Sequence, residues 1–464
     1  MSSNLSFVDD SRDSCARMKK MRRNLVRVHL ILAAVVGAAA CGTPTRLPVS
    51  AGIGPRPVLP PPKESLIPVI NVVKAKGWGV DATPVAADGL TVRAFARGLN
   101  HPRWLYVLPN GDVLVAETNA PKRPDDNKGI KGVFFRFFQA KAGGAVPSAN
   151  RIVLLRDTNG DGVADTRSEF LSGLHSPFGM TLVGDVLYVA NTDAIVRVPY
   201  TNGATSIGAP ATKVVDLPAG RINHHWTKNV IASPDGSKLY ASVGSNSNAA
   251  ENGILHEEGR AAVWEIDRLT GKHRVFASGL RNPVGLAWEP ERKALWVAVN
   301  ERDELGSDLV PDYITSVRDG GFYGWPYSYY GKHPDSRVTP QRPELIERAI
   351  VPDYALGPHT ASLGLTWSAG GPRSLPMRFS SGMFVGQHGS WNRKPRSGYK
   401  VIFVPFDHGM PTGEPIDVLS GFVKENGEAM GRPVGVAIDR QGALLVADDV
   451  GNVIWRVTRA SPRQ

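Results

Sequence analysis

Apolar residues along this chain form short runs or alternate with polar residues at a period of two, as at 295–300 (Leu-Trp-Val-Ala-Val-Asn) and 444–449 (Leu-Leu-Val-Ala-Asp-Asp). No long stretch follows the 3.6-residue period of an amphipathic helix. Asp-Gly, Asn-Gly and Gln-Gly pairs separate consecutive runs, and such pairs favour the tight turns of β-hairpins. The pattern predicts an all-β protein built from hairpins.

The hairpins recur as one unit, which opens with a Gly-Leu or polar turn, often has a Pro next, and continues into two apolar strands. Six copies occur, at 98–115, 173–189, 225–243, 279–299, 359–385 and 431–446. Closing four-stranded units into a ring removes exposed sheet edges, so we predict a six-bladed β-propeller over residues 85–464. The strand at 90–96 is expected to complete the blade that contains 453–457, and two β-sandwiches are the alternative architecture.

Two segments, 120–150 and 301–345, fit no blade. Loops that leave a rigid scaffold commonly carry its ligand sites. We therefore expect both segments to be inserts around the mouth of the central channel.

The N-terminal region reads as a targeting signal. A charged stretch at 18–23 precedes a short apolar run at 30–40, which predicts a signal peptide over residues 1–40, with Met18 as a second candidate start. Ala38-Ala39-Ala40-Cys41-Gly42 resembles a bacterial lipobox, although Ala38 stands where a larger apolar residue is usual. We expect a periplasmic protein that meets the membrane only through a lipid on Cys41, with cleavage without lipid as the alternative. The Pro-rich residues that follow are expected to be a tether within 41–84.

Cysteine content and charge narrow the chemistry. The only cysteines among the 464 residues are Cys15 and Cys41, so a processed, lipidated protein would have no thiol for disulfides, metal ligation or nucleophilic catalysis. Four of the eleven net positive charges lie in residues 1–40, and the remainder has no Lys/Arg run to follow a phosphate backbone. We expect no nucleic-acid partner.

Three fragments carry candidate chemistry. The first is 223–229, where His224 and His225 precede a strand and would lie at the channel mouth as metal ligands, as a base with its neighbour, or as ordinary loop residues. The second is Gly279-Leu280-Arg281-Asn282-Pro283, followed by the charged 300–304 and the aromatic 320–326; a salt-bridged loop is the alternative.

The third fragment, 387–394, is rich in basic residues together with its neighbours. It contains Arg393, Lys400 follows, and Arg432 opens the next blade. If these cations converge on the channel they would bind a polyanionic ligand, because guanidinium groups pair with carboxylates in bidentate fashion. Each of them taken singly is more often a surface residue.

These motifs together resemble the soluble glucose/sorbosone dehydrogenases that depend on pyrroloquinoline quinone (PQQ). The resemblance rests on the Gly-Leu-Arg-Asn-Pro segment, Gly-Gly-Phe-Tyr-Gly-Trp-Pro at 320–326 and Arg432-Pro433 in the last blade. The segments 117–121, 300–306 and 388–393 are closer to the sorbosone-dehydrogenase-like branch. The resemblance spans roughly residues 85–460, and only the combination of these motifs is specific to the family.

The resemblance implies a six-bladed propeller with PQQ over the channel and Ca²⁺ beside it. His225 falls on the family's catalytic histidine, while His224 stands where the glucose enzymes have an acidic residue that orients it. Arg281 and Asn282 match the cofactor-contacting pair, and Arg432 matches a late arginine. The family's lysine has no direct counterpart, so Lys400 or Arg393 would serve, and its substrate glutamine is not recovered, although His175 lies near its position.

The implied function is a periplasmic PQQ-dependent dehydrogenase that oxidises an aldose or a sorbosone-like sugar aldehyde. PQQ carries three carboxylates and a quinone that accepts hydride, which Ca²⁺ promotes, while a neutral histidine removes the hydroxyl proton. The electrons would pass to an acceptor such as a cytochrome or a quinone. A calcium-dependent lactonase or esterase and a non-catalytic binding propeller are the alternatives, since propellers host many functions.

A separate motif at 157–165 predicts a structural calcium loop. Asp157, Asn159, Asp161 and Asp165 stand at positions 1, 3, 5 and 9, with Gly162 at position 6, as at the front of an EF-hand loop. Ser168 stands where the loop's final Glu is expected. An Asx-rich hairpin turn is the alternative.

Overall fold

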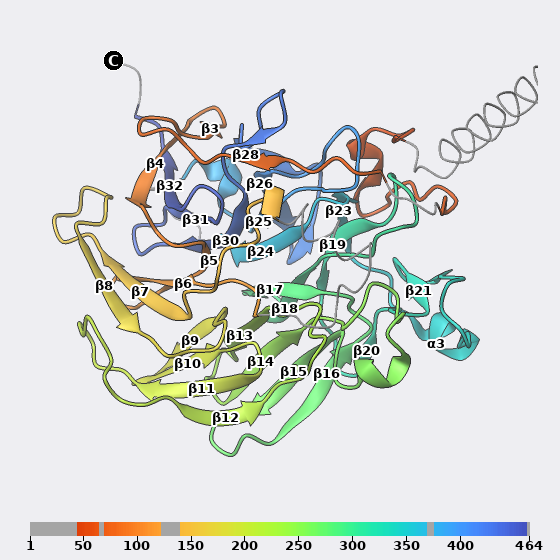
Figure 1. Cartoon of the computed structure of the whole chain (residues 1–464), viewed down its shortest axis with the longest axis horizontal. Helices are drawn as coiled ribbons and strands as arrows, with labels where there is room; N and C mark the ends of the chain where they lie inside the picture. The colour runs from red at the N-terminus through yellow and green to blue at the C-terminus, as the bar shows by residue number, and fades with distance from the viewer. Residues whose placement is uncertain (1–43, 65–68, 122–139, 369–374, 462–464) are drawn as a thin grey trace, which may run out of the picture.

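The computed structural model describes residues 44–64, 69–121, 140–368 and 375–461. The predicted signal peptide, Met18, Cys15 and Cys41 lie outside these residues. Within them the chain forms six antiparallel blades around a central channel (Figure 1), which confirms the predicted six-bladed β-propeller. No helix of the described part is long and apolar enough to cross a membrane.

The first three blades follow one another along the chain, each running from an inner strand at the channel to an outer strand. Blade 1 comprises β5 (Pro102–Val107), β6 (Val113–Glu117), β7 (Arg151–Arg156) and β8 (Thr166–Leu171). Blade 2 comprises β9 (Met180–Val183), β10 (Val186–Ala190), β11 (Ala194–Pro199) and β12 (Thr212–Asp216). Blade 3 comprises β13 (Lys228–Ala232), β14 (Lys238–Val243), β15 (Ala262–Asp267), β16 (His273–Ser278) and the short β20 (Gly321–Phe322).

The other three blades recruit strands from the N-terminal region. Blade 4 comprises β17 (Pro283–Glu289), β18 (Ala294–Val299), β19 (Pro311–Ser316), β23 (Tyr354–Pro358) and β1 (Ile53–Gly54). Blade 5 comprises β24 (Ser362–Trp367), β25 (Gly382–Gln387), β26 (Lys400–Asp407), β28 (Ile416–Ser420) and β3 (Val85–Ala86), with β27 (Met410–Pro411) beside β26. Blade 6 comprises β30 (Pro433–Ile438), β31 (Leu444–Asp448), β32 (Val453–Arg459) and β4 (Leu90–Arg97).

The ring closes as the sequence predicts, because β4 pairs antiparallel with β32, for example Val92 with Val457. Each predicted copy supplies the two inner strands of one blade. The predicted turns form as well: Gly236, at φ +69°, closes the β13–β14 hairpin, where its amide donates to the Ser233 carbonyl at 2.8 Å. Only glycine adopts that backbone conformation without strain.

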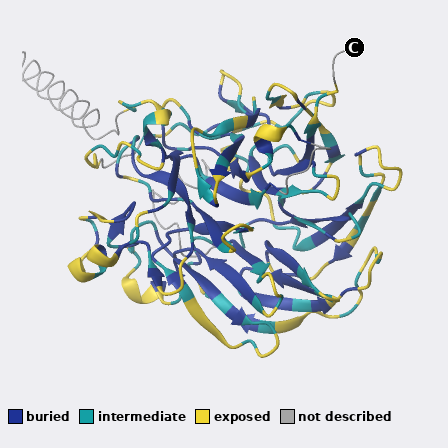
Figure 2. Ribbon diagram, turned by 180° about the vertical axis from the view of Figure 1, so that it is seen from behind, coloured by how far each residue is buried: buried dark blue, intermediate teal, exposed yellow. Residues whose placement is uncertain are grey.

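Apolar side chains between neighbouring blades hold the ring together, and the inner strands are buried, whereas parts of the outer strands and many loops are exposed (Figure 2). Trp104 on β5 packs against Phe178 with ring centroids 4.7 Å apart. Phe178 in turn meets Trp226, just before β13, edge to face at 6.1 Å. This aromatic row links blades 1, 2 and 3 and packs directly beneath the loop that carries His224 and His225.

Two expectations for the chain outside the repeats differ from the structure. Part of 301–345 does belong to a blade, because β19 is the third strand of blade 4. Its first five residues are all buried, so the sequence Pro-Asp-Tyr-Ile-Thr lacks the alternation that would have identified it. The rest of that insert carries β21 (Ser328–Tyr329), β22 (His333–Pro334) and α3 (Pro343–Arg348). The expected tether is also packed on the propeller in its described part. Its strand β1 pairs with β23, and its strand β2 (Lys74–Ala75) pairs with β29 (Glu428–Ala429).

Candidate functional site

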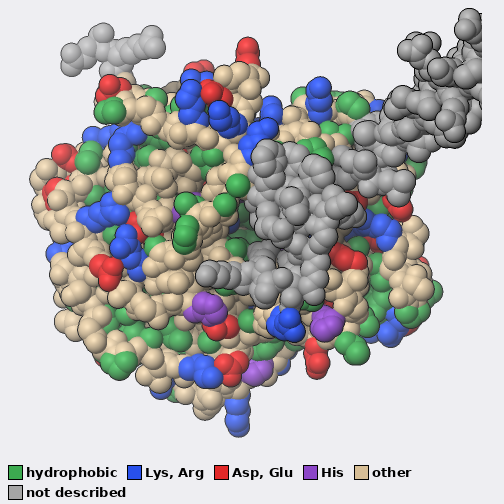
Figure 3. All heavy atoms as spheres, in the orientation of Figure 1, with side chains coloured by type: hydrophobic (Ala, Val, Ile, Leu, Met, Phe, Trp, Pro, Cys, Tyr) green, Lys and Arg blue, Asp and Glu red, His purple; other side chains and the backbone are tan. Residues whose placement is uncertain are grey.

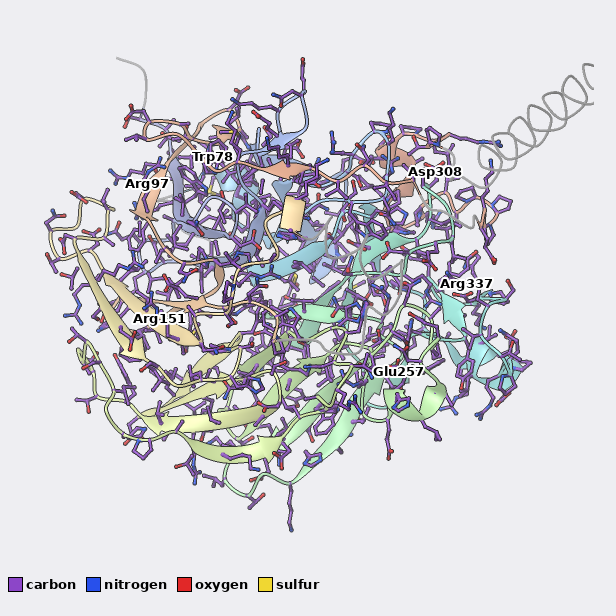
Figure 4. All side chains as sticks on the ribbon, viewed as in Figure 1. Trp78, Arg97, Arg151, Glu257, Asp308 and Arg337 are labelled. Atoms are coloured by element: carbon purple, nitrogen blue, oxygen red, sulfur yellow. The ribbon has the colours of Figure 1, made fainter. Side chains whose placement is uncertain are left out.

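A cavity of about 820 Å³ opens where the inserts of blades 3 and 4 meet the channel mouth. His224, His225 and Arg281 line it, together with Asp303 and Arg337 from the insert at 301–345 and Trp391 from the loop between β25 and β26. Arg337 projects from the insert that carries β21 and α3 (Figure 4). Histidine, basic and acidic side chains gather on the face shown in Figure 3, where Figure 1 shows β13 to β20. The structure therefore brings the first two sequence fragments together in one polar cavity.

His225 is held in one ring orientation. Its Nδ1 lies 2.8 Å from the carbonyl oxygen of Ser245 and 3.0 Å from the hydroxyl oxygen of the same residue. A carbonyl can only accept, so the neutral ring carries its proton on Nδ1, and Nε2 is the basic nitrogen. His224 stands edge-on to this ring with the centroids 4.7 Å apart. The pair has the arrangement of an oriented general base with a polar neighbour.

The backbone of the histidine loop rests on a closed ring of buried hydrogen bonds. Lys228 is fully buried, and its Nζ donates to the carbonyl oxygens of His225 at 3.2 Å and Trp226 at 3.4 Å. Thr192 donates to the Trp226 carbonyl at 2.8 Å and accepts from the Asn223 amide at 2.8 Å. Asn223 closes the ring, because its side-chain oxygen lies 3.5 Å from Nζ of Lys228. This network fixes the loop on which His225 sits.

Arg281 and Asn282 sit next to the histidines, at the start of β17. Arg281 is 2% exposed, and it donates to the Glu301 carbonyl at 2.7 Å and to Oδ1 of Asn248 at 2.9 Å. Burial lowers the pKa of Arg281, although the carboxylate of Asp303, 3.8 Å away, partly offsets that effect. The guanidinium is thus rigidly placed by the protein.

Asn282 lies beside Gly244, close to His225. Its Oδ1 is buried and has no hydrogen-bond partner among the described residues. A Cβ on Gly244 would lie 2.4 Å from this oxygen and 2.5 Å from Cβ of His225. Only glycine leaves room for His225 and Asn282 to approach each other here.

Asp303 lines the same cavity beside Arg281 and is itself held by two side chains. Asn392 donates to its Oδ1 at 2.8 Å, and Nδ1 of His359 lies 3.2 Å from the same oxygen. Burial alone would raise the pKa of Asp303, but the His359 hydrogen bond and the Arg281 charge outweigh it, and the pKa is lowered. Nε2 of His359 lies 2.9 Å from the Gly306 carbonyl, so both ring nitrogens face acceptors. Burial opposes the charged ring, yet the Asp303 interactions raise the pKa of His359.

Of the third sequence fragment and its basic neighbours, Trp391 reaches this cavity, but Arg393 and Lys400 do not line it. Arg393 is fully buried and donates to the carbonyl oxygens of Ser307, Pro395 and Leu47 at 3.0–3.2 Å. Lys400, on β26, pairs with Asp417 at 2.7 Å. The structure gives both residues contacts within the protein and does not bring them together with Arg281.

Arg432 belongs to a second polar group, formed where blades 1, 5 and 6 meet the channel. It donates to the His388 carbonyl at 2.9 Å. Asp449 lies between His388 (2.9 Å) and Arg103 (2.7 Å). Burial and the charge of Arg432 lower the pKa of His388 to about 3, which keeps that ring neutral. Burial opposes ionisation of Asp449, but the His388, His101 and Arg103 interactions outweigh it and lower its pKa.

Sequence reasoning missed Arg103, Asp449 and Arg337. A signal for Arg103 exists in the repeat, because His101-Pro102-Arg103 opens blade 1 at the position where Asn282-Pro283 opens blade 4. Arg337 lies in an insert that has no counterpart in the other repeats, so the repeat pattern does not predict where its side chain lies.

The predicted calcium loop joins β7 to β8 and forms a network of local hydrogen bonds. Asp157 accepts from the amides of Gly160 (2.8 Å) and Gly162 (2.7 Å), and Asp165 accepts from Thr158. Side-chain bonds of this kind to nearby backbone amides are typical of Asx turns. Among the described residues no group of three or more His, Cys, Asp or Glu side chains is arranged to hold a metal ion. Calcium binding by Asp157, Asn159, Asp161 and Asp165 stays a prediction.

Known proteins resemble this chain in fold and, at about a quarter of the aligned positions, in sequence. A family model described as TrAA12-like matches residues 84–312 and 345–460. An uncharacterized protein of Borreliella burgdorferi is 26% identical over 294 residues, 61% of this chain and 76% of its own length. The pyrroloquinoline quinone-dependent pyranose dehydrogenase of Coprinopsis cinerea is 25% identical over 439 residues, which is 81% of this chain but only 54% of that enzyme.

Solved structures agree on the architecture. The holo PQQ domain of the Coprinopsis cinerea pyranose dehydrogenase superposes with a TM-score of 0.64 at 19% identity, covering 84% of this chain and 100% of that domain. A Trichoderma reesei structure of Carbohydrate-Active Enzymes Family AA12 gives 0.64 at 18% identity, covering 81% of this chain and 98% of that one. At these identities the structures establish the shared fold.

Proposed function

We propose that this chain, which belongs to the TrAA12-like family, is a PQQ-dependent dehydrogenase that oxidises an aldose or a related sugar aldehyde. The curated relative with a described activity is a PQQ-dependent sugar dehydrogenase, of which this chain matches about half the length. The observation that carries the proposal is the arrangement of His225, whose tautomer is set by Ser245, in the same cavity as Arg281.

The residues present fit PQQ. Its carboxylates need cationic donors, and the two polar groups contain such donors, Arg281 in the first and Arg103 and Arg432 in the second. Nε of Arg103 is buried without a hydrogen-bond partner among the described residues, as is Oδ1 of Asn282. We infer that Arg281, Asn282, Arg103 and Arg432 would hold the cofactor, with donors for its carboxylates and one acceptor.

PQQ supplies a quinone that accepts hydride from the substrate carbon. The chain's own part is to place the sugar hydroxyl within reach of Nε2 of His225, which accepts the hydroxyl proton. The neutral tautomer is required, because a ring protonated on both nitrogens has no acceptor left.

Calcium beside the cofactor is a further part of the proposal. Since no cluster of acidic side chains is arranged for a metal in the described residues, such an ion would take carbonyl, amide, water and cofactor oxygens.

Reconstitution tests the proposal. Purified protein should reduce a dye with an aldose or sorbosone only after PQQ is added, and added Ca²⁺ should raise the rate over an EDTA-treated sample. No turnover with any sugar in the PQQ-loaded protein would overturn the dehydrogenase. Hydrolysis of lactones or esters without PQQ would support the hydrolase alternative instead.

Location and electron transfer follow as proposals of the same kind. We propose cleavage before Cys41, lipidation of that residue and a periplasmic enzyme that passes electrons to a cytochrome or a quinone. The charged and apolar stretches of residues 18–40 support export. Mass spectrometry of the mature protein should find the N-terminus at Cys41 with an added lipid mass; an intact Met1 or Met18 terminus contradicts processing.

A further inference from the structure

Residues 44–64 and 69–83, here called the N-terminal clamp, lie before the family match, which begins at residue 84. They pack on the propeller and do not extend away from it. β1 adds an outer strand to blade 4, with Ile53 opposite Leu356, and β2 pairs parallel with β29, with Lys74 opposite Glu428. The sequence of this region suggested a spacer, so its contacts call for another explanation.

The clamp is hydrogen-bonded to the loop at 303–309. The amide of Lys63 donates to the Leu305 carbonyl at 2.9 Å, and the amide of Arg46 donates to Oδ2 of Asp308 at 2.7 Å. Figure 4 shows Asp308 beside this N-terminal segment. The same loop begins with Asp303 on the cavity wall.

The clamp is also hydrogen-bonded to the loop at 391–396. Asn71 is bonded to it three times: its amide donates to the Trp391 carbonyl at 2.8 Å, its side chain donates to the Arg393 carbonyl at 2.8 Å, and its carbonyl accepts from Arg396 at 3.2 Å. Trp391 lines the cavity, and the next residue, Asn392, donates to Asp303.

Arg393 ties the two loops and the clamp together. Its Nε donates to the Ser307 carbonyl at 3.1 Å, and its Nη2 donates to the Leu47 carbonyl at 3.2 Å and lies 3.5 Å from Oδ1 of Asp308. The guanidinium is fully buried, so each bond is shielded from water and costly to lose.

We infer that the N-terminal clamp is part of the site machinery, and that Asn71 and Arg393 are positioning residues for Asp303 and Trp391. Two cavity-wall loops that come from different blades are locked to each other through one strand-forming segment of the N-terminal region. If the loop at 303–309 or the loop at 391–396 loosens, Asp303 or Trp391 moves in the cavity wall, because both side chains come from these loops. The catalytic part of this inference rests on the proposed function, whereas the effect on the loops does not.

The test compares Asn71→Ala and Arg393→Met with Arg97→Met in the full chain. Arg97 is a matched control because it also holds the N-terminal region, donating to the Ala82 carbonyl at 3.1 Å, but does so on blade 6. Hydrogen exchange of the cofactor-free protein should quicken about 5- to 10-fold in 303–309 and 391–396 for the first two variants, the effect of losing a hydrogen bond or two. Arg97→Met should leave both loops unchanged.

Kinetics of the PQQ-loaded protein give the second readout. Asn71→Ala should lower kcat/KM for the sugar about tenfold or more, because small displacements in a site are costly, while Arg97→Met keeps wild-type values. If hydrogen exchange in both loops is unchanged in Asn71→Ala and Arg393→Met, the clamp does not hold the loops and the inference is overturned. Equally fast exchange in Arg97→Met overturns it as well. Faster exchange with unchanged kinetics overturns the positioning role. A wild type inactive on all sugars counts against the proposed function only, and Asn71→Ala decides the matter if Arg393→Met fails to fold.

Discussion

Gly244→Ala tests the geometry of the candidate site most directly. The new methyl group would lie 2.5 Å from Cβ of His225 and 2.4 Å from Oδ1 of Asn282, whereas ordinary contacts begin at 3.4 Å. His225 or Asn282 therefore has to move by about 0.9–1.0 Å. A misplacement of ~1 Å can cost ~10²-fold in rate, and overpacking costs about 1–3 kcal/mol in stability. We expect a folded protein with turnover reduced about 100-fold.

The assay is dye reduction by the PQQ-loaded protein, with thermal unfolding measured alongside. Gly208→Ala is a neutral control, since nothing lies within 4 Å of its Cβ. Gly321→Ala is a control for crowding, because its Cβ would lie 2.8 Å from the Arg318 carbonyl, outside the cavity, and should lower stability while sparing turnover. Wild-type turnover in Gly244→Ala would refute the roles of His225 and Asn282 in a single reaction site.

Three further predictions use the same preparations. His225→Ala should lose ~10²–10⁴-fold in turnover while still binding PQQ, and His224→Ala should lose no more than about tenfold; the reverse order would shift the base to His224. Arg281→Ala should weaken PQQ binding by about 1.5–3 kcal/mol in a titration, and unchanged affinity would remove Arg281 from the cofactor site. Asp312 is a buried residue of β19, and burial raises its pKa to about 6, so the folded protein favours the protonated carboxyl group. The contribution of Asp312 to the free energy of unfolding is therefore full below pH ~4 and is lost as the pH rises through 6. Wild type should therefore gain on the order of 2 kcal/mol over Asp312→Asn when unfolding is measured at pH 4.5 instead of 7.5, and a pH-independent difference would contradict this.

The architecture was readable from the sequence because each blade's inner hairpin is a local pattern. The copies at 98–115 and 431–446 became the inner strands of blades 1 and 6, and the strand at 90–96 closed the ring as expected. The sequence predicted a channel-mouth position for the histidine pair, which precedes the inner strand β13. Arg281 precedes the inner strand β17, and the structure shows that it lines the same cavity.

Contacts between segments far apart in the chain were decided only by the tertiary structure. Arg393 looked like a cofactor ligand because arginine is suited to carboxylates, yet the docking of Leu47, 346 residues earlier, determines where its donors point. The Pro-rich region looked like a spacer because its composition forms no core of its own, yet its strand β1 pairs with the edge of blade 4 and its strand β2 pairs with β29. Periodicity and turn residues specify which strands form, since those are short-range effects. Which polar side chains meet in a cavity depends on how the ring closes and on where the inserts fold. The inserts do not follow the repeat, so a single sequence does not show which blade residues they meet.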